Sequence, residues 1–418
     1  MNFKFLLSAG LVASTFVAEA QNANRGFAIT GDGNKDYMWM NIRQVDLGTG
    51  QVNTTVFDRT KSSFTITDVE AKKTFNQTTV NDGTAKSAAL YPTSSFVAAA
   101  AYDRRNEKLF FVPMRVGQLR WMDASLKNDV PTFYSIAIPN YTPSTNIEEA
   151  NNITRMVIGS DNVGYAITND GNHLYKFTTG RKPVITDLGP LMDAENNNGF
   201  SVHNKCSSWG GDMIGDAYGK LYIITASRNV FVIDADTRIT TYKGTISSLP
   251  ANYTTNGAAV DADGSVILCS ATAFEGYYKM SITDLAAKKI EGSDVVYNAS
   301  DLASGNLLFE KEADQARANS FAKLVPANTN VINENTVFPN PITGSSFNVA
   351  IAGKLQGNYT IIITDLAGRV MQSTRTAMTK GQQTQKVNFT SRPVKGTYLV
   401  RVLDEKGTEI LSDKLMVL

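Results

Sequence analysis

A turn-and-strand unit that recurs along the chain restricts the folds open to its first three quarters. In three places an Asp-x-x-Gly turn precedes an apolar run, beginning at Asp161, Asp216 and Asp261, and a degenerate copy begins at Asp103. The aspartate carboxylate accepts hydrogen bonds within such a turn, and we expect the glycine to take a positive φ as the chain enters the strand. A unit repeated in this way predicts a repeat architecture.

The spacing of the repeats favours a β-propeller. The four aspartates stand 58, 55 and 45 residues apart, and each unit offers a second turn and a further strand. That length suits four-stranded blades with inserted loops. A β-sandwich or a β-helix is the alternative, although such units are too long for one coil of a β-helix. Residues 21–325 therefore predict a β-propeller-like domain in an all-β chain, with five or six blades and seven as the upper limit.

Small residues support the propeller and bear on how it closes. Ala98–Ala101, Gly210–Gly211 and Gly257–Ala259 stand just before the turns, where inner strands converge on a central channel. The first blade lacks an inner strand of its own, and a late segment can close the ring of such a propeller. Tyr297–Asp301 and Ser320–Leu324 are the candidates. The interval 53–95 predicts either an extra blade or an insertion.

The end of the chain predicts a second, smaller domain. Residues 326–336 are rich in Asn and show no periodicity, which indicates a linker. From residue 337 to 418, alternating strands are separated by glycine turns. This pattern predicts a small antiparallel sandwich of the immunoglobulin-like kind.

Several short motifs run through this domain. They are Phe338 with Pro339, Asn340 and Pro341, then Gly357 and Tyr359, then Asp365, Gly368 and Arg369, then Gly396 and Tyr398, and finally Lys414. In this order they resemble the type A C-terminal sorting domain of the type IX secretion system of Gram-negative bacteria, in which the first motif is usually Tyr-Pro-Asn-Pro. An ordinary immunoglobulin-like binding domain is the alternative.

The resemblance implies a destination rather than a chemistry. It implies that the type IX machinery is a partner, and that the chain passes through the periplasm to the outer-membrane surface or the medium. The domain is carried by proteases, glycosidases, adhesins and binding proteins alike, so it does not identify an activity.

The first twenty residues predict a secretory signal peptide. Lys4 supplies the positive region, Phe5–Val17 the apolar region and Ala18-Glu19-Ala20 the cleavage site. The apolar region is shorter than the ~20 residues that span a bilayer, and we predict no transmembrane segment in the mature chain. The formal net charge of +1 offers no general argument for nucleic acid as a partner.

Few residues suggest metal or catalytic chemistry. Cys206 and Cys269 either form a disulfide or are two buried thiols. His173 and His203 lie outside any G-x-S-x-G or H-E-x-x-H motif and are predicted to be structural. Asp32–Asp36 weakly echoes a calcium loop, for which turn formation is the favoured interpretation. We expect no metal, no cofactor and no recognisable catalytic constellation.

Residues just before the inner strands predict the lining of the channel mouth. Aligning the units on their aspartates places Thr154, Trp209 and Thr254 at equivalent positions, with Arg155, Asp212 and Asn256 nearby. Trp209 can stack on a sugar ring, and the three polar side chains can bind hydroxyl groups. The alternative is that Trp209 is wedged between blades and that Arg155 pairs with a carboxylate.

Three functions are consistent with the sequence. The first is an exported, non-catalytic propeller that binds glycan or protein at the cell surface. The second is an extracellular polysaccharide hydrolase or lyase that uses carboxylates such as Asp212. The third is a structural component of the cell surface or of motility.

Overall fold

A computed structural model of the chain describes residues 24–77, 91–127, 130–143, 148–292, 296–324, 335–351, 356–378, 384–391 and 393–418. The predicted signal peptide and most of the predicted linker lie outside these residues. The chain divides into two compact units, up to Asp314 and from Gln315 onward. This boundary falls within helix α3 (Glu310–Leu324), whereas the sequence predicts a propeller-like domain that extends to residue 325.

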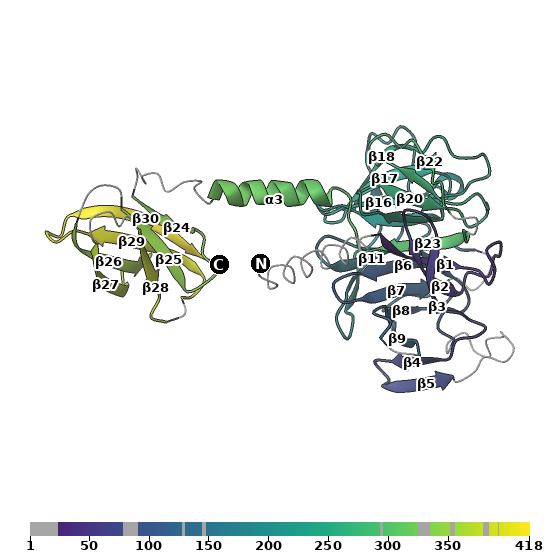
Figure 1. The fold of residues 1–418 in the computed structure, drawn as a ribbon, viewed down its shortest axis with the longest axis horizontal. Coiled ribbons are helices and arrows are strands. Elements are labelled where there is room, and N and C mark those ends of the chain that lie inside the picture. The colour runs from purple at the N-terminus through teal and green to yellow at the C-terminus, as the bar shows by residue number, and fades with distance from the viewer. Residues whose placement is uncertain are drawn as a thin grey trace, which may run out of the picture. The chain divides into compact units, whose positions relative to one another are not determined.

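The described part of the first unit consists of five sheets (Figure 1). In order from the inner strand outward, the first contains β23 (Ala299–Ser304), β1 (Arg25–Thr30), β2 (Asn41–Asp46) and β3 (Val52–Phe57). The second contains β6 (Val97–Asp103), β7 (Lys108–Pro113), β8 (Gln118–Asp123) and β9 (Thr132–Ala137). The third contains β10 (Ile153–Ile158), β11 (Val163–Thr168), β12 (Leu174–Thr178) and β13 (Ile185–Asp187).

The remaining two sheets follow the same plan. The fourth contains β15 (Asp212–Gly215), β16 (Lys220–Ile224), β17 (Asn229–Asp234) and β18 (Ile239–Thr245), with β14 (Met192–Asp193) added in parallel to β18. The fifth contains β19 (Gly257–Val260), β20 (Val266–Cys269), β21 (Tyr278–Met280) and β22 (Lys288–Lys289). A short helix, α2 (Lys205–Ser208), precedes β15.

The five inner strands form a closed ring. They are neighbours in the cyclic order β23, β6, β10, β15, β19 and back to β23. Residues from the C-terminal halves of all five line one narrow cavity, so the strands run in the same direction along the channel. This arrangement is a five-bladed β-propeller, and it confirms the predicted fold class.

A late segment closes the ring, as predicted. The strand β23 pairs antiparallel with β1, with Gly26 opposite Ser304 and Ile29 opposite Asp301. It overlaps the first predicted segment, Tyr297–Asp301. The second, Ser320–Leu324, is wrong because those residues belong to α3.

The interval 53–95 holds an insertion rather than an extra blade. Strands β4 (Phe64–Asp68) and β5 (Lys73–Gln77) extend the second sheet at its outer edge, where β4 pairs in parallel with β9. Residues 78–90 lie outside the described part of the chain. The second blade is therefore six strands wide.

The hydrophobic cores lie between neighbouring blades. Along a strand, successive side chains point to opposite faces of the sheet. Phe27 and Ile29 accordingly pack in the cluster between the first and second blades, whereas Ala28 packs between the first and the fifth. The inner strands are largely buried on both faces and combine apolar residues with small and polar ones, as in the sequence of β23, Ala299–Ser304. The propeller is held together mainly by the removal of these surfaces from water.

The second unit is a two-layer β-sandwich. One sheet has the order β24 (Thr336–Phe338), β25 (Ser346–Ala350), β28 (Thr384–Asn388). The other has the order β27 (Val370–Met378), β26 (Gly357–Asp365), β29 (Gly396–Leu403), β30 (Glu409–Val417). Both sheets contribute to one core, which includes Phe347, Tyr359, Val400 and Leu415. In the described part of the chain, no helix is long and apolar enough to cross a membrane.

Candidate binding face and sorting domain

The mouth face is the end of the propeller at which the five inner strands begin. Thr30, at the end of β1, pairs with Ala299 at the start of β23, so the β1–β2 loop lies at this face. Cys269, at the end of β20, pairs with Gly257 at the start of β19, which places the β20–β21 loop there too. The mouth face is therefore built from these loops and from the segments that lead into the inner strands.

The turns at the opposite end only partly follow the expected pattern. In the turns at Asp216 and Asp261, the carboxylate accepts two backbone amides, and Gly219 and Gly264 have φ of 90° and 82°. The turn near Asp161 instead begins at Gly159, whose carbonyl oxygen accepts the amide of Asn162. The residue with positive φ in this turn is Asn162.

Gly164 is therefore not a turn glycine but part of β11. A Cβ atom there would lie 2.0 Å from the ring of Phe177, so close packing rather than backbone conformation requires glycine. The alignment of the units on their aspartates is consequently wrong by two residues for the unit of Asp161.

The correct register brings three charged residues into one layer of the ring. Arg155, Asp212 and Asp301 each stand three residues before the last paired residue of their inner strand, as Gly257 does. All three charged side chains are fully buried. Gly257 is required at its position in this layer, because a Cβ atom there would meet the sulfur of Cys269 at 2.5 Å and the amide nitrogen of Leu302 at 2.8 Å.

Asp212 bonds to inner strands of two other blades. Its carboxylate accepts the amides of Met213 and Ala258 at 2.7 Å each, and that of Leu302 at 3.4 Å. The amides of inner strands that face the channel have no further strand to bond, and this carboxylate satisfies them. Burial raises the pKa of Asp212 well above its usual range, while the amides and Arg155 act in the opposite direction.

Asp301 has weaker support than Asp212. Among the described residues, neither oxygen of its carboxyl group has a hydrogen-bond partner within 3.5 Å. Burial raises the pKa of Asp301 well above its usual range, and the nearby charge of Asp212 raises it further, while the backbone amide of Ala100 acts in the opposite direction. Two buried carboxyl groups that act on each other cannot both ionise freely, so the pair retains a proton at higher pH than exposed aspartates do.

Arg155 joins the third blade to the segment before the fourth. Its guanidinium donates to the carbonyl oxygens of Ser208 at 2.7 Å, Gly210 at 3.1 Å and Asn169 at 3.2 Å. Burial lowers the pKa of Arg155 to about 10, so the group is charged at neutral pH. Arg155 thus bonds to backbone carbonyl groups, whereas the alternative from the sequence was a pair between Arg155 and a carboxylate.

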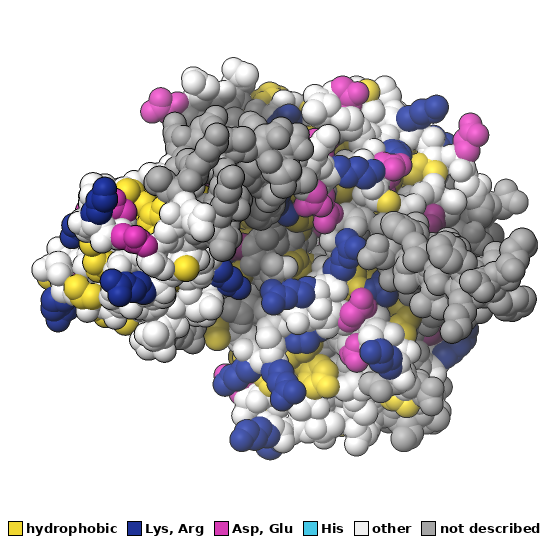
Figure 2. Space-filling model, turned by 60° about the vertical axis from the view of Figure 1, so that its left-hand side comes forward, with side chains coloured by type: hydrophobic (Ala, Val, Ile, Leu, Met, Phe, Trp, Pro, Cys, Tyr) yellow, Lys and Arg dark blue, Asp and Glu magenta, His cyan; other side chains and the backbone are white. Residues whose placement is uncertain are grey.

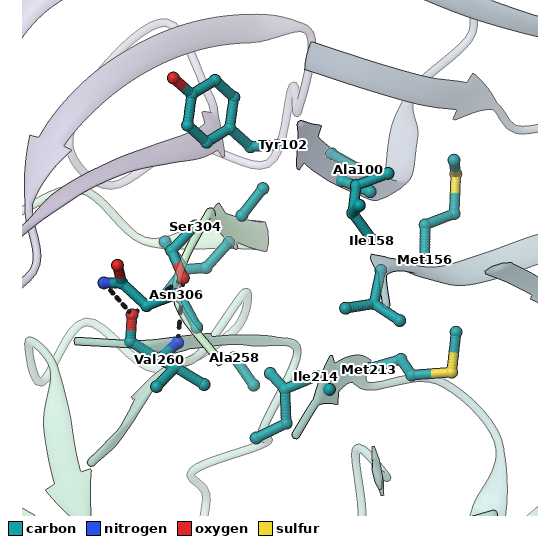
Figure 3. Close-up of a pocket in the computed structure, with 16 residues that line it drawn as sticks. Ala100, Tyr102, Met156, Ile158, Met213, Ile214, Ala258, Val260, Ser304 and Asn306 are labelled. Carbon is teal, nitrogen blue, oxygen red and sulfur yellow. Dashed lines mark hydrogen bonds between the residues drawn. The ribbon is translucent and has the colours of Figure 1, made fainter. Parts of the chain in front are cut away.

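The channel beyond this layer is almost filled. A cavity of about 10 Å³, comparable to a single water, begins at the next residue of four strands: Met156, Met213, Ala258 and Leu302. Figure 3 shows the inner strands converging on it, with Asn306 and Ser304 bonded to the backbone of Val260. The channel thus has no room for a sugar at this depth, and the carboxyl groups of Asp212 and Asp301 are not accessible from it.

Trp209 and Asn256 are half-buried at the mouth face. The ammonium group of Lys205, in α2, lies 4.8 Å from the ring centre of Trp209 and covers one of its faces. The side-chain oxygen of Asn256 accepts the hydroxyl of Thr254 at 2.5 Å and the amide of Ala271 at 3.0 Å. The four residues predicted to bind ligand thus comprise two buried charges and two partly covered side chains rather than one open site.

The cysteines and histidines have structural surroundings. Cys206 is exposed, Cys269 is fully buried, and both are free thiols, so the disulfide considered from the sequence is not formed. His173 bonds to the carboxylate of Asp187 at 2.7 Å, and His203 bonds to the carbonyl oxygen of Asp170 at 2.7 Å. The described residues contain no cluster of three or more His, Cys, Asp or Glu side chains that would hold a metal ion.

An aromatic ledge on the mouth face was not anticipated from the sequence. It consists of Tyr37, Trp39, Phe96 and Phe274. Ring centres are 6.0 Å apart for Tyr37 and Trp39, 5.6 Å for Tyr37 and Phe274, and 6.4 Å for Trp39 and Phe96. Tyr37 is 52% exposed and Phe274 is 41% exposed. The detectable signal was the run from Tyr37 to Met40, which is apolar although it lies in a connection between strands.

Asn298 holds the two loops of the ledge together. Its buried side chain donates to the carbonyl oxygens of Asp36 at 2.9 Å and Ala271 at 2.7 Å. Asp36 then accepts the amide of Tyr37 at 2.6 Å. Asp32 forms an ion pair with Arg59 at 2.5 Å. The carboxylates of Asp32 and Asp36 are thus bonded to protein groups in and beside the β1–β2 loop, which agrees with a role in turn formation.

A hollow of about 460 Å³ adjoins the ledge between the fifth and first blades. Phe274 lies at its border, and its lining also includes Asn34, Lys35, Glu275, Tyr277, Lys289 and Glu291. On the face of the molecule shown in Figure 2, charged side chains of both signs are interspersed with small hydrophobic patches.

In the second unit, the first and last motifs of the predicted sorting domain are bonded to each other. The side chain of Asn340 donates to the carbonyl oxygen of Lys414 and accepts the amide of Met416 at 2.8 Å. The amide of Ile342 donates to the carbonyl oxygen of Met416 at 2.8 Å. The Pro339-Asn340-Pro341 sequence is thereby attached alongside β30.

The intermediate motifs form turns and strand beginnings. The carboxylate of Asp365 accepts the amides of Ala367 and Arg369 and pairs with the Arg369 guanidinium at 2.7 Å, while Gly368 has φ of 81°. Gly357 and Gly396 begin β26 and β29. The rings of Tyr359 and Tyr398 are buried in the core of the sandwich. Each of these motif residues therefore has a part in the fold of the domain.

Comparison with known proteins identifies this second unit. Residues 336–417 match the family model described as a secretion system C-terminal sorting domain. A search of curated proteins finds no match to the chain.

Solved structures similar to the chain include PorZ, an essential bacterial surface component of the type IX secretion system of Porphyromonas gingivalis. It is 14% identical with a TM-score of 0.31, over 94% of this chain and 51% of PorZ. The chain thus spans about half the length of PorZ.

A streptogramin B lyase is 11% identical with a TM-score of 0.33, over 66% of this chain and 86% of the lyase. A chain of a nidogen–laminin complex is 12% identical with a TM-score of 0.35, over 84% of this chain and 92% of the other. From the family match and the motif geometry, residues 336–417 are a C-terminal sorting domain of the type IX secretion system, and the chain is exported through the periplasm to the cell surface or the medium.

Proposed function

We propose that the protein is a non-catalytic binding protein that acts outside the cell and binds its ligand on the mouth face of the propeller. The observation that carries this proposal is the aromatic ledge. Tyr37 and Phe274 expose about half of their surfaces at a position where two loops are rigidly joined by Asn298. Exposed aromatic side chains on a fixed backbone are typical of binding sites because they contribute contact area at little cost in conformational entropy.

The buried charges favour binding over hydrolysis. A glycosidase needs two carboxyl groups on either side of the scissile bond. Asp212 and Asp301 bring two carboxyl groups into one layer of the ring, which is the observation behind a polysaccharide hydrolase or lyase as the second candidate. Against this candidate, both groups are fully buried, Asp212 already accepts three backbone amides, and the adjoining cavity has the volume of one water molecule.

Binding of the secreted full-length protein to isolated cell envelopes and extracellular polymer tests the proposal. We expect saturable binding by the wild-type protein and at least a tenfold loss of affinity in the double variant Tyr37→Ser/Phe274→Ser. Tyr218→Ser is the matched control, because Tyr218 is 60% exposed but lies in a turn at the opposite end of the propeller. Equal binding by the ledge variant and the control would contradict the proposal.

A polysaccharide degradation assay distinguishes the second candidate. Release of sugar products by the wild-type protein, lost in Asp212→Asn, would support catalysis and contradict the proposed function.

A further inference from the structure

The hollow beside the aromatic ledge has the dimensions of a ligand site. Its volume of about 460 Å³ falls within the range of ~300–1,000 Å³ that is usual for small-ligand pockets. One side is formed by Asn34 and Lys35 of the β1–β2 loop, and the other by Phe274 and Glu275 of the β20–β21 loop. The two loops that carry the ledge thus also form the walls of the hollow.

The hollow has a fixed floor. Tyr277 is buried beneath it, and its carbonyl oxygen accepts the amide of Ile290 at 3.0 Å. The hydroxyl of the buried Tyr253 donates to the carbonyl oxygen of Gly276 at 2.9 Å. Gly292 approaches the backbone of Thr49 so closely that a Cβ atom there would lie 2.4 Å from the carbonyl oxygen. A ligand would therefore meet a surface whose shape is largely set in advance, which reduces the entropy lost on binding.

The polar groups around the hollow are of mixed character. Lys35 and Lys289 donate hydrogen bonds, Glu275 and Glu291 accept them, and Asn34 does both. Among the described lining residues, two positive charges balance two negative ones, and the pair Lys289–Glu275 is 4.0 Å apart. A hydroxyl group both donates and accepts, so an uncharged polyol satisfies such a set, whereas a polyanion gains no net attraction from it.

The aromatic border complements these groups. Phe274 is 41% exposed at the edge of the hollow, and its ring centre is 5.6 Å from that of Tyr37. The carbon-bound faces of a sugar ring pack on such side chains, while its hydroxyl groups bond to donors and acceptors beside them. From this juxtaposition we infer that the hollow between the β1–β2 and β20–β21 loops binds a neutral oligosaccharide, with Phe274 and Tyr37 as the stacking residues. The inference rests on the proposed function, because it names the ligand class of the same face.

Titration of the full-length secreted protein with oligosaccharides tests the inference. The probes are neutral cello-, manno-, xylo- and malto-oligosaccharides, compared with oligogalacturonates and sulfated glycosaminoglycan fragments. We expect at least one neutral series to bind and the acidic probes to bind at least tenfold more weakly. Phe274→Ala should weaken neutral binding at least tenfold, and Lys289→Met should weaken it severalfold. Tyr218→Ala should leave it unchanged, with thermal unfolding confirming that all variants are folded.

The other outcomes separate this inference from the proposed function. Binding of acidic probes alone would overturn the neutral ligand class. Ledge-dependent binding to a cell-surface protein, without binding to any sugar, would overturn the inference and leave the proposed function standing. Sugar binding that survives Phe274→Ala and Tyr37→Ala would overturn the site. Absence of ledge-dependent binding to sugars, envelopes and extracellular polymer would overturn both.

Discussion

The carboxyl groups of Asp212 and Asp301 occupy one sealed layer of the channel with a single guanidinium group, that of Arg155. If all three were ionised, one negative charge would be buried without compensation, which is costly in a low-dielectric interior. The carboxylate of Asp212 accepts three amides, whereas the carboxyl oxygens of Asp301 have no hydrogen-bond partner within 3.5 Å among the described residues. A proton is therefore best placed on Asp301.

The pH dependence of stability should reveal this proton. Burial and Asp212 raise the pKa of Asp301 above the ~3.9 of an unfolded aspartate. The stabilisation from this proton is fully present below the unfolded pKa and is lost as pH rises through the folded pKa. Over that range the free energy of unfolding should fall by up to about 1.4 kcal/mol per pH unit. Asp301→Asn keeps the shape of the protonated carboxyl group and a hydrogen-bond donor, but it does not titrate. This variant should therefore flatten the fall of the free energy of unfolding with pH.

Urea unfolding between pH 4 and pH 9 measures the effect. Asp301→Asn should be more stable than the wild-type protein at pH 8, while Asp284→Asn, at an exposed aspartate, should leave the slope unchanged. Parallel stability profiles for the wild-type protein and Asp301→Asn would show that Asp301 is ionised in the folded state.

Gly164 provides a second prediction at this scale. A methyl group there would lie 2.0 Å from the ring of Phe177, so Gly164→Ala should overpack the interface between the second and third blades. We expect a loss of about 1–3 kcal/mol in the free energy of unfolding. Gly33→Ala is the control, because its Cβ would meet no atom within 4 Å. Equal chemical-denaturation midpoints for the two variants would contradict the packing argument.

Gly164 also shows where reasoning from the sequence fails. Asp161 and Gly164 match the spacing of a turn motif. The chain nevertheless turns two residues earlier, at Gly159, so the match is a coincidence. A local pattern does not distinguish a glycine needed for backbone conformation from one needed for close packing. The shifted register in turn concealed the equivalence of Arg155, Asp212 and Asp301, which depends on strand pairing between segments far apart in the chain.

At the scale of elements, strands and their closure could be predicted better than loops. The apolar runs that became β11, β16 and β20 are buried on both faces. Closure by a late strand could be predicted because the first blade lacks an inner strand of its own. The aromatic ledge was not predicted because it joins the β1–β2 loop, the start of β6 and the β20–β21 loop. Only the ring closure through β23 and Asn298 brings these segments together.

The attachment of the Pro339-Asn340-Pro341 sequence to β30 yields a prediction for this scale. Asn340 is bonded to the backbone at Lys414 and Met416, so Asn340→Ala removes both bonds. We expect the sandwich to lose on the order of 1–2 kcal/mol of stability, and the fraction of protein reaching the surface or medium to fall. Asn358→Ala is the control, since Asn358 bonds to the exposed side chain of Glu405. Normal export of Asn340→Ala with an unchanged unfolding transition would contradict this role.

At the scale of the whole molecule, export and the proposed ligand binding belong to different domains. The sorting domain accounts for export, and its motif residues contribute to its own fold. The propeller closes its ring within residues 24–304, because β23 supplies the inner strand of the first blade. This strand includes Asp301 and Leu302. The folding of the propeller should therefore not require the sorting domain.

Truncation of the secreted chain tests this division. A chain ending at residue 324 keeps β23 and should fold with the same thermal unfolding transition for the propeller, but it should accumulate in the periplasm. A chain ending at residue 298 lacks β23, so the edge of β1 is unpaired and the first blade loses its inner strand. That chain should be degraded or aggregate, as limited proteolysis and gel filtration would show. Delivery of the 324-residue chain to the medium would contradict the assignment of export to the sorting domain. A protease-resistant monomer ending at residue 298 would contradict closure by β23.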